Sequence, residues 1–382
     1  MDFQTLQALL PAPGQEPDWA ALMHGIPALL ALEGTPQDPL YHAEGNVLIH
    51  TRMVVEALLD SAAYAAASTE QRFILFYACL LHDIAKPSTT VIDEATGRIG
   101  QPGHSARGAV DARVILWRAG VPFDIRETIC RIIAVHQVPF FALNDRRGDK
   151  PAEYVVRKLS WELPLWMLCA VASADMQGRG FDGKQAVLDD IELFRLLAEE
   201  EGCLHHPRAF ADAYTRLAYF QGAKVHPDYA LHREREGSSV IVMCGLPASG
   251  KNTWVASQHP HLPCVSFDDA REELGLAHGK NEGRVAHHAI DKARQLLRER
   301  QPFVWNATHL SRQMRKKTLD LLHGYGAQVT LCYLEQAEKE LYRRNSQRDS
   351  SLRNKDLARM FHRWEVPTPV EAEAVEYLVS HG

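Results

Sequence analysis

Apolar residues recur at helical spacing through most of the first 220 residues. Residues three and four apart share one face of a helix, so this spacing gives each helix an apolar face for packing. The pattern predicts helices over 47–66, 72–81, 107–118, 125–136 and 161–176. The exception is 89–99, where Thr96 and Gly97 separate two short apolar runs and predict a small hairpin. We therefore expect an all-α first domain over 1–223.

The pattern changes after a polar stretch at 224–239, whose Pro and Gly residues predict a linker. Short apolar runs then alternate with stretches of helical spacing. The runs lie at 240–244, 264–267, 303–305 and 328–334. Strands that alternate with helices are typical of a parallel sheet. The fold expected is multidomain: an all-α helical bundle, followed at 240–382 by an α/β domain with a parallel sheet.

The composition is that of a globular protein, with 46% hydrophobic and 24% charged residues, and 382 residues suffice for two or three domains. No apolar run approaches the roughly 18 residues that span a membrane, and the N-terminus lacks a signal pattern. The seven cysteines are scattered, without a Cys-x-x-Cys pair, as is usual for reduced thiols. We expect a cytoplasmic protein without a membrane partner.

The net charge of −6 does not by itself predict nucleic-acid binding. The stretch 312–363 differs, because it holds 12 Lys and Arg against 6 Asp and Glu. Such a stretch is either a solvated helical face or an electrostatic track for phosphates. The sequence leaves both interpretations open.

The clearest chemical signal is the loop after the apolar run 240–244. It reads Gly-Leu-Pro-Ala-Ser-Gly-Lys-Asn-Thr, and a helix is predicted from Trp254 onward. In a strand–loop–helix of this kind, backbone N–H groups and the ammonium group of Lys251 face a bound phosphate. The loop predicts a site for ATP or another nucleoside triphosphate with Mg²⁺, formed by Gly245, Pro247, Ala248, Ser249, Gly250, Lys251, Asn252 and Thr253. Asn252 stands where Ser or Thr normally holds magnesium, which predicts an altered metal contact.

Further polar residues follow the predicted strands. Asp268 and Asp269 come after the second strand, and strand ends in such sheets face the ligand crevice. A carboxylate there can take the proton of an attacking hydroxyl, although Asp269 could serve only as a helix cap. Arg344 and Arg348 lie where a helix runs into a polar loop. They either close over a transferring phosphoryl group or lie solvated at the surface.

Six side chains of the first domain are of the type that binds first-row divalent cations. They are His50, His82, Asp83, His104, His136 and Asp175. A single histidine on an apolar helix is more often a core residue, so each counts for little alone. Asp83 differs, because it closes the apolar helix at 73–81, where a buried carboxylate needs a cation or strong donors. One or two ions of Mn²⁺, Ni²⁺, Co²⁺ or Cu²⁺ would suit such a site.

The pattern of His50, His82-Asp83, Lys86 and Asp175 resembles the HD phosphohydrolase superfamily, over about residues 25–220. The sequences of residues 42–51 and 103–108 are similar to those of the HD domain found beside bacterial tRNA nucleotidyltransferases. The resemblance implies that His50, His82, Asp83 and Asp175 hold one metal, and that Asp83 bridges to a second, held by His104 and His136. It also implies that Lys86 contacts the substrate phosphate; an exposed helix-end lysine is the alternative.

The second domain resembles the 5′-hydroxyl polynucleotide kinases over about residues 238–370. The phosphate loop, Asp268-Asp269-x-Arg271 and Arg344-Asn345-Ser346-x-Arg348 carry the resemblance. It implies that Asp268 is the general base for a 5′-hydroxyl and that Arg271 contacts a nucleic-acid phosphate. Arg344 and Arg348 would form a lid, with Arg348 near the nucleotide phosphates beside Lys251. Asn306 stands where many relatives have Asp, and no role is carried onto it.

The combination resembles the bacterial HD-Pnk end-healing enzymes. It implies phosphorylation of 5′-OH ends of RNA or DNA and hydrolysis of 2′,3′-cyclic phosphate or 2′-phosphate ends, before a separate ligase joins the strands. The partners expected are single-stranded nucleic-acid termini and a nucleoside triphosphate. Two alternatives stay open: an HD nucleotidase fused to a nucleoside or metabolite kinase, and a metal-free bundle that regulates an NTPase. The oligomeric state is also open, a homodimer included.

Overall fold

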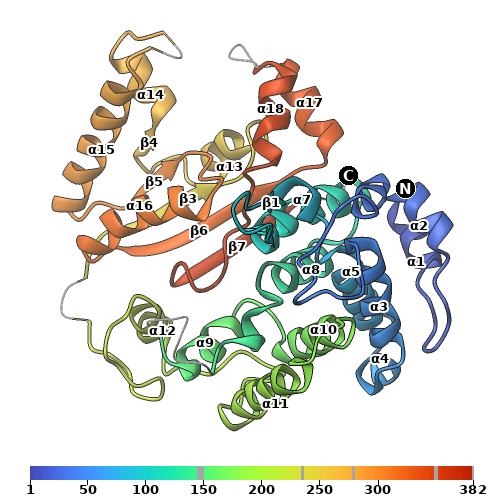
Figure 1. Cartoon of the computed structure of the whole chain (residues 1–382). Helices are drawn as coiled ribbons and strands as arrows, with labels where there is room; N and C mark the ends of the chain where they lie inside the picture. The colour runs from blue at the N-terminus through green and yellow to red at the C-terminus, as the bar shows by residue number, and fades with distance from the viewer. Residues whose placement is uncertain (144–149, 234–235, 278–279, 348–351, 381–382) are drawn as a thin grey trace. The chain divides into compact units, whose positions relative to one another are not determined.

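The computed structural model describes residues 1–143, 150–233, 236–277, 280–347 and 352–380. The chain forms two compact units, Met1–Arg208 and Ala209–Gly382. The first unit is helical and the second combines helices with a parallel sheet (Figure 1). This confirms the expected order of an all-α domain followed by an α/β domain.

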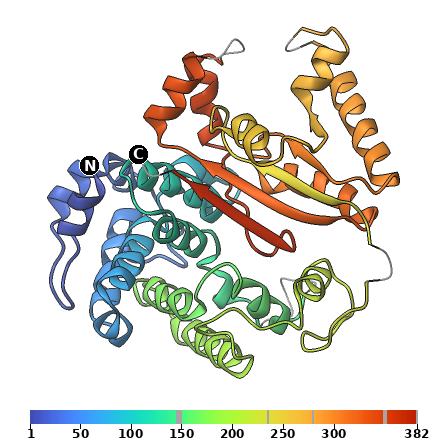
Figure 2. The ribbon, with the colours of Figure 1, turned by 180° about the vertical axis from the view of Figure 1, so that it is seen from behind.

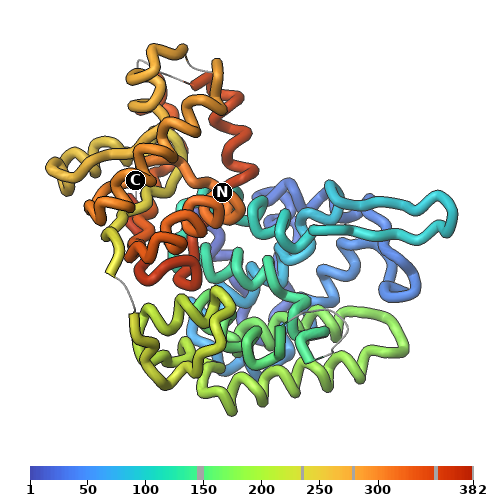
Figure 3. The backbone as a smooth tube through the Cα atoms, turned by 90° about the vertical axis from the view of Figure 1, so that its left-hand side faces the viewer, coloured from blue at the N-terminus to red at the C-terminus, as the bar shows by residue number. Residues whose placement is uncertain are grey.

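The first unit consists of helices and one small hairpin. Its elements are α1 (Phe3–Ala8), α2 (Trp19–Gly25), η1 (Pro27–Leu32), α3 (Val47–Leu59), α4 (Ala62–Ala66), α5 (Thr69–Leu81), α6 (Lys86–Thr89), β1 (Val91–Ile92), β2 (Ile99–Gly100), α7 (His104–Arg118), α8 (Phe123–Val135), η2 (Val138–Phe140), α9 (Ala152–Leu159), α10 (Leu165–Gln177) and α11 (Lys184–Glu200). The hairpin pairs β1 with β2 antiparallel, as expected, and projects from the unit in Figure 3.

The single helix expected over 47–66 is wrong, because the structure has two helices there. Asp60 ends α3, and the side chain of Ser61 then accepts a hydrogen bond from the Tyr64 N–H to cap α4. A serine side chain that satisfies a free backbone donor starts a new helix in a new direction. Apolar spacing continues through the break, which is why it does not reveal the cap.

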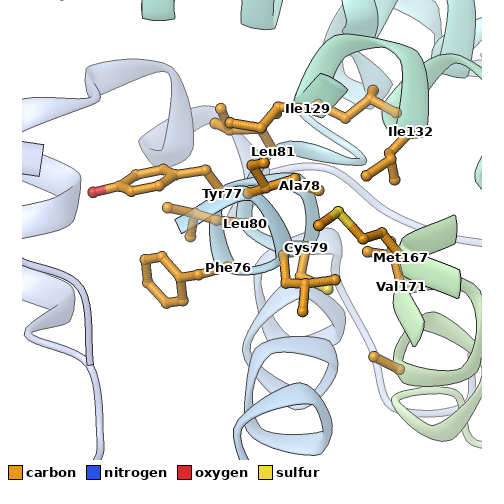
Figure 4. Close-up of a cluster of buried hydrophobic side chains, with 14 of the residues drawn as sticks. Phe76, Tyr77, Ala78, Cys79, Leu80, Leu81, Ile129, Ile132, Met167 and Val171 are labelled. Carbon is orange, nitrogen blue, oxygen red and sulfur yellow. The ribbon is translucent and has the colours of Figure 1, made fainter. Parts of the chain in front are cut away.

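Helix α5 forms the centre of the first unit. All nine residues of Phe73–Leu81 are buried, because α5 packs against α3, α8 and α10. Figure 4 shows Phe76 to Leu81 beside Ile129 and Ile132 of α8 and Met167 and Val171 of α10. A helix buried on all sides carries whatever follows its last turn into the interior. The residues that follow are His82 and Asp83.

The second unit contains a five-stranded sheet of order β4-β5-β3-β6-β7, with every pair parallel. Its elements are α12 (Ala213–Phe220), β3 (Ser239–Cys244), α13 (Lys251–Gln258), β4 (Cys264–Ser266), α14 (Phe267–Glu273), α15 (Glu282–Arg298), β5 (Phe303–Asn306), α16 (Arg312–Gly324), β6 (Gln328–Glu335), α17 (Glu338–Ser346), α18 (Asn354–Phe361) and β7 (Ala374–Val379). The four expected strands correspond to β3–β6. Strand β7, at one edge of the sheet and red in Figure 2, was not predicted.

The units divide at Arg208, before the expected domain end at 223. Helix α12 belongs to the second unit. Arg216 Nη2 donates hydrogen bonds to the carbonyl oxygens of Ala372, at 3.1 Å, and Glu373, at 2.6 Å. These contacts join α12 to the loop before β7, a pairing that helical spacing alone does not reveal.

The parallel register places the carboxyl ends of three strands at one edge of the sheet. Ser266, at the end of β4, lies opposite Asn306 at the end of β5. The phosphate loop follows β3, which pairs with β5 and β6. The loop, Asp268 and Asn306 therefore meet at this edge, as expected for an open α/β sheet.

Two observations concern the apolar content of the chain. Over the residues that the structure describes, no helix has both the length and the apolar character needed to cross a membrane. The seven cysteines are free thiols, and six of them are buried. The apolar runs of the sequence therefore correspond to core helices and strands.

Candidate functional site

The six residues expected to hold metal come from separate elements of the first unit, and the structure brings them together. His50 lies on α3, His82 and Asp83 follow α5, His104 begins α7, His136 follows α8 and Asp175 lies on α10. All six are buried. The four histidines surround the carboxylates of Asp83 and Asp175.

Three imidazoles approach the Asp83 carboxylate. His82 Nε2 lies 3.1 Å from Oδ2, and His50 Nε2 lies 3.6 Å from the same oxygen. His104 Nε2 lies 3.5 Å from the other oxygen, Oδ1. Asp83 is thus shared by two groups whose ligand atoms lie within 4.8 Å of one another, His50–His82–Asp83 and Asp83–His104–His136.

The Asp175 carboxylate completes the cluster. His50 Nε2 lies 3.1 Å from Oδ1, and His136 Nε2 lies 3.8 Å from Oδ2. Arg179, one helical turn further on, donates to both oxygens at 2.9 Å, and its guanidinium lies 5.2 Å from the centre of the Phe140 ring. Asp175 is therefore held by an arginine fork as well as by imidazoles.

All four imidazoles are oriented by a hydrogen bond from Nδ1. The acceptors are carbonyl oxygens of Gly178 for His50 at 3.3 Å, Cys79 for His82 at 2.7 Å, Gln101 for His104 at 2.8 Å and Ile133 for His136 at 2.8 Å. His50 Nδ1 also lies 3.0 Å from Glu44 Oε1. A neutral imidazole that donates from Nδ1 carries its lone pair on Nε2. This arrangement is typical of histidines that bind metals, because it fixes both tautomer and ring direction.

The cluster contains acceptors without donors. Neither oxygen of Asp83, nor Nε2 of His136, accepts a hydrogen bond from any residue described. Lys86 Nζ lies 2.7 Å from Asp83 Oδ2, but outside hydrogen-bond geometry. Buried acceptors left unsatisfied cost free energy, and a divalent cation satisfies several of them at once. The six residues therefore fit a site for one or two divalent cations.

The protonation states of Asp83, His136 and His104 agree with this interpretation. For His50, by contrast, the effect of burial is outweighed by the Asp175 and Glu44 carboxylates, which raise its pKa. Burial alone would raise the pKa of Asp83, but the charges of His82 and Lys86 outweigh it and hold that pKa well below its usual range. Burial lowers the pKa of His136 to about 3 and also lowers the pKa of His104. At neutral pH the carboxylate is charged and these imidazoles are neutral, which are the forms that bind metal.

The alternative interpretation of Lys86 as an exposed lysine at a helix end is wrong, because Lys86 is buried. Its side chain is 3% exposed, and Nζ donates to Gln37 Oε1 at 2.6 Å. Burial of an ammonium group beside Asp83 places a positive charge at the edge of the cluster. Contact between Lys86 and a substrate phosphate stays a prediction.

Sequence reasoning missed three residues around this cluster: Gln37, Glu44 and Arg179. Arg179 had a detectable signal, because an acid and an arginine four residues apart face each other on a helix. Glu44 lies in the segment 42–51 that carried the resemblance, but no role was assigned to it. The contact of Gln37 with Lys86 depends on the fold and has no signal in the sequence.

The phosphate loop of the second unit adopts a conformation that requires glycine at Gly245, with φ +136°. A Cβ there would lie 2.3 Å from the Leu334 carbonyl oxygen on β6. Lys251 begins α13, and its Nζ donates to the carbonyl oxygens of Gly245 at 3.0 Å and Leu246 at 2.8 Å. The loop and the start of α13 thus form the expected cradle at the end of β3.

A pocket of about 1180 Å³ opens beside the loop. Every expected nucleotide-site residue that the structure describes, apart from Gly245, lines it, and so do Asp268, Arg271 and Asn306. Gly245, the first residue of the loop, lies against β6 instead. Arg348 lies outside the described residues.

Arg271, in the pocket, pairs with two carboxylates. Arg271 Nη1 donates to Asp268 Oδ1 at 2.8 Å, and Arg271 Nη2 donates to Glu282 at 2.7 Å. A Cβ on Gly250 would lie 3.0 Å from Arg344 Nη1, so the Arg344 side chain reaches the loop. Ser266 caps α14, and Asp269 lies in its first turn rather than at the cap.

Two asparagines meet where the phosphate loop departs from its usual pattern. Asn306 Nδ2 donates to Asn252 Oδ1 at 2.9 Å. The two departures from the usual residues are thus in contact. Asn252 and Asn306 lie 54 residues apart along the chain, so their contact has no signal in the sequence.

Part of the basic stretch 312–363 serves the fold. In the part of this stretch that the structure describes, the cations in ion pairs include Arg315, Lys316, Arg343, Arg344, Arg353 and Arg359. Arg315 is buried, pairs with Glu371 and donates to the carbonyl oxygens of His309 and Glu365. A track for phosphates along the remaining cations stays a prediction.

Comparison with known families identifies a domain in each unit. Residues 47–158 match the model of the HD domain, and residues 240–367 match a model of an AAA domain. The first match contains five of the six metal-site residues, and the second contains the phosphate loop. The two matches do not overlap, and each lies within one unit, so that one family model describes part of the first unit and the other part of the second.

Three curated relatives have the name multifunctional CCA protein. The protein of Halorhodospira halophila is 38% identical over 128 residues, which are 34% of this chain and 28% of the relative. That of Cupriavidus metallidurans is 37% identical over 116 residues, 30% of this chain and 25% of the relative. That of an Acidovorax species is 34% identical over 142 residues, 37% and 29% respectively. The matched segments thus span little more than a quarter of each relative.

Proposed function

We propose that this chain, with an HD domain before an AAA domain, heals broken nucleic-acid ends. The AAA domain would phosphorylate 5′-OH ends of RNA or DNA with a nucleoside triphosphate. The HD domain would hydrolyse 2′,3′-cyclic phosphate and 2′-phosphate ends. Many RNA breaks leave a 5′-OH and a cyclic phosphate, whereas ligases need a 5′-phosphate and a 3′-OH. The observation that carries the proposal is a cluster of residues suited to divalent cations in the first unit and a phosphate loop with a pocket beside it in the second.

In the HD domain, divalent cations held by the six clustered residues would lower the pKa of a water molecule and polarise the phosphate. The imidazoles with Nε2 turned inward support this assignment. The attacking oxygen forms a bond to phosphorus, the bond from phosphorus to one ribose oxygen breaks, and that oxygen takes up a proton. Lys86 would neutralise charge on the phosphate, since its ammonium group already lies at the edge of the cluster.

In the AAA domain, Asp268 would take the proton of the 5′-hydroxyl as its oxygen forms a bond to the γ-phosphorus. The bond from that phosphorus to its bridging oxygen breaks, and a nucleoside diphosphate leaves. Lys251, Arg344 and Arg348 would neutralise the charge that moves to the bridging oxygen. Arg271 would exchange the Asp268 carboxylate for a phosphate of the nucleic acid, which frees Asp268 to act as the base.

One experiment tests both activities. The purified protein is incubated with an RNA oligonucleotide that has a 5′-OH and a 2′,3′-cyclic phosphate, with ATP, Mg²⁺ and a panel of Mn²⁺, Ni²⁺, Co²⁺ and Cu²⁺. We expect a 5′-phosphate and loss of the cyclic phosphate at the 3′ end. Asp268→Ala should lose only the first product and Asp83→Ala only the second.

Two outcomes would contradict the proposal. If either single substitution abolished both products while the fold survived, the two-site model would be wrong. If the protein modified nucleosides or small phosphoesters but neither end of the oligonucleotide, the substrate class would be wrong. Affinity for the oligonucleotide should also fall steeply with salt, because phosphate contacts release counterions.

A further inference from the structure

We propose that Glu44 is a positioning residue of the HD metal site, which fixes His50 with Nε2 as its ligand atom and ties the Asp175 helix to α3. This inference rests on the metal site of the proposed function. Glu44 itself does not reach the cluster of ligand atoms. It acts through two of the expected ligands, His50 and Asp175, which lie far apart along the chain.

One oxygen of Glu44 orients the histidines. His50 Nδ1 lies 3.0 Å from Oε1, and His42 Nδ1 lies 2.7 Å from the same oxygen. The Glu44 side chain is only 3% exposed, so these contacts are shielded from water. The His42 and His50 rings pack edge to face at 4.8 Å, which further restricts the rotation of His50. A donor at Nδ1 leaves the lone pair of His50 on Nε2, toward Asp83 and Asp175.

The other oxygen of Glu44 holds the chain that leaves α10. The Gly180 N–H donates to Oε2 at 2.8 Å, and the Ala43 N–H donates to the Gly180 carbonyl oxygen at 3.1 Å. Asp175 lies five residues before Gly180. Glu44 and its neighbour therefore fasten the segment that follows Asp175 to the segment that precedes His50, across 136 residues of sequence.

The chemistry requires a carboxylate at this position. Glu44 meets three N–H donors, those of His42, His50 and Gly180, and offers acceptors on both oxygens. A glutamine of the same shape has one acceptor oxygen, and its amide NH₂ would face another donor. The negative charge also makes the imidazole of His50 a more basic ligand.

His42, Glu44 and His50 could instead be considered as a third cation site, because their ligand atoms lie close together. The hydrogen bonds argue against it. Nδ1 of His50 lies 3.3 Å from the Gly178 carbonyl oxygen as well as 3.0 Å from Glu44, so that its neighbours are acceptors for a proton. A carboxylate that orients a ligand from behind explains all of these contacts.

Mn²⁺ binding tests the role of Glu44. Titration calorimetry compares the full-length wild type with Glu44→Gln and with Glu56→Gln, which removes an exposed carboxylate on α3, the helix that carries His50. We expect Glu44→Gln to weaken Mn²⁺ binding by about 10- to 100-fold, the usual effect of removing an outer hydrogen-bond partner. Glu56→Gln should bind as the wild type does, and 5′-phosphorylation by the AAA domain should be unchanged in both variants.

The tautomer of His50 provides a second measurement, made on the metal-free protein by ¹⁵N NMR of the imidazoles at a pH above the raised pKa of His50, where the ring is neutral. The wild type should show His50 protonated at Nδ1, and Glu44→Gln should show a mixture of tautomers. Equal Mn²⁺ affinity in wild type and Glu44→Gln, or an unchanged tautomer, would overturn the role of Glu44 alone. A wild type that binds no divalent cation would overturn the metal site and this role together.

Discussion

Single residues of this protein have effects that follow from what each side chain contacts. Asn252 and Asn306 each replace the residue usual at their position, and they are hydrogen-bonded to each other in the pocket. Neither offers the charge or hydroxyl that normally meets magnesium. They present one neutral amide surface beside the phosphate loop, so we interpret the two departures as one coupled change.

We therefore predict that Asn252 and Asn306 act as a unit in binding a nucleotide with Mg²⁺. Replacing either with Ala should weaken binding, because the remaining amide loses its partner. The double substitution should cost less than the sum of the two, with a coupling of about 1 kcal/mol. A double-mutant cycle on the dissociation constant of Mg²⁺-ADP measures this coupling. Additive effects would show that the two amides act separately.

His309 predicts a pH dependence in the second unit. Burial is the main cause that lowers its pKa to about 4, although the hydrogen bond to the Met243 carbonyl oxygen opposes this. In the unfolded chain the imidazole takes up a proton near 6.5, so between pH 6.5 and 4 the unfolded state binds more protons. The contribution of His309 to the free energy of unfolding should therefore be complete above pH 6.5. It should decrease by up to about 3 kcal/mol as the pH falls toward 4.

Denaturant unfolding followed by tryptophan fluorescence measures this loss, because Trp305 lies beside His309. The matched variant is His309→Asn. His309 has φ 44°, a left-handed conformation that Asn tolerates, and an Asn amide can also donate to the Met243 carbonyl oxygen. The variant should lose the part of the pH dependence that belongs to His309. An identical pH profile in both proteins would refute the assignment.

Elements differ in how far the sequence predicts them. The runs that became β3–β6 are short and mostly apolar, because most of their residues are buried against the helices that cover the sheet. Strand β7 lies at the sheet edge and alternates exposed with half-buried residues, Glu376 among the exposed ones, so its apolar signal is weak. The break between α3 and α4 was missed because a side-chain cap ends the helix while apolar spacing continues.

The candidate sites show the same division. The residue types of the metal cluster and the phosphate loop are visible in the sequence, because their chemistry requires His, Asp, Gly and Lys. The contacts that support these residues are not visible in the sequence. The hydrogen bonds of Glu44 to Gly180 and of Asn306 to Asn252 join residues that are distant along the chain, and only the packing of helices and strands brings them together.

The junction of β3 with the phosphate loop allows a prediction at the scale of elements. Gly245→Ala would put a Cβ 2.3 Å from the backbone of β6, at a φ that L side chains rarely adopt. The loop must shift, so we expect nucleotide affinity to fall at least about tenfold and the second unit to lose roughly 2–4 kcal/mol. Gly324→Ala, at the end of α16 with open space around it, is the matched control.

Calorimetry and Mg²⁺-ADP binding measure both effects. Gly324→Ala should be neutral in binding and in stability. If Gly245→Ala bound Mg²⁺-ADP as the wild type does, the close approach of the loop to β6 would not be required for the cradle.

At the scale of the whole molecule, the two units have separate hydrophobic interiors. The core around α5 draws its buried residues from Leu6 to Leu204, whereas the buried strands β3–β6 belong to the second unit. Among the residues that the structure describes, the candidate metal ligands lie in the first unit and the phosphate loop lies in the second. Ligands of the two sites should therefore stabilise different parts of the chain.

We predict two thermal transitions in the full-length protein, each sensitive to one ligand. Mn²⁺ should raise the transition temperature of the first unit only, and Mg²⁺-ADP that of the second unit only. At a hundred times its dissociation constant, each ligand should add about 2.7 kcal/mol to the free energy of unfolding of its unit. Asp83→Ala should abolish the first shift and Lys251→Ala the second, which assigns each transition in scanning calorimetry. A single transition that both ligands raise would mean that the units unfold together, and the separation of the two sites would then not extend to stability.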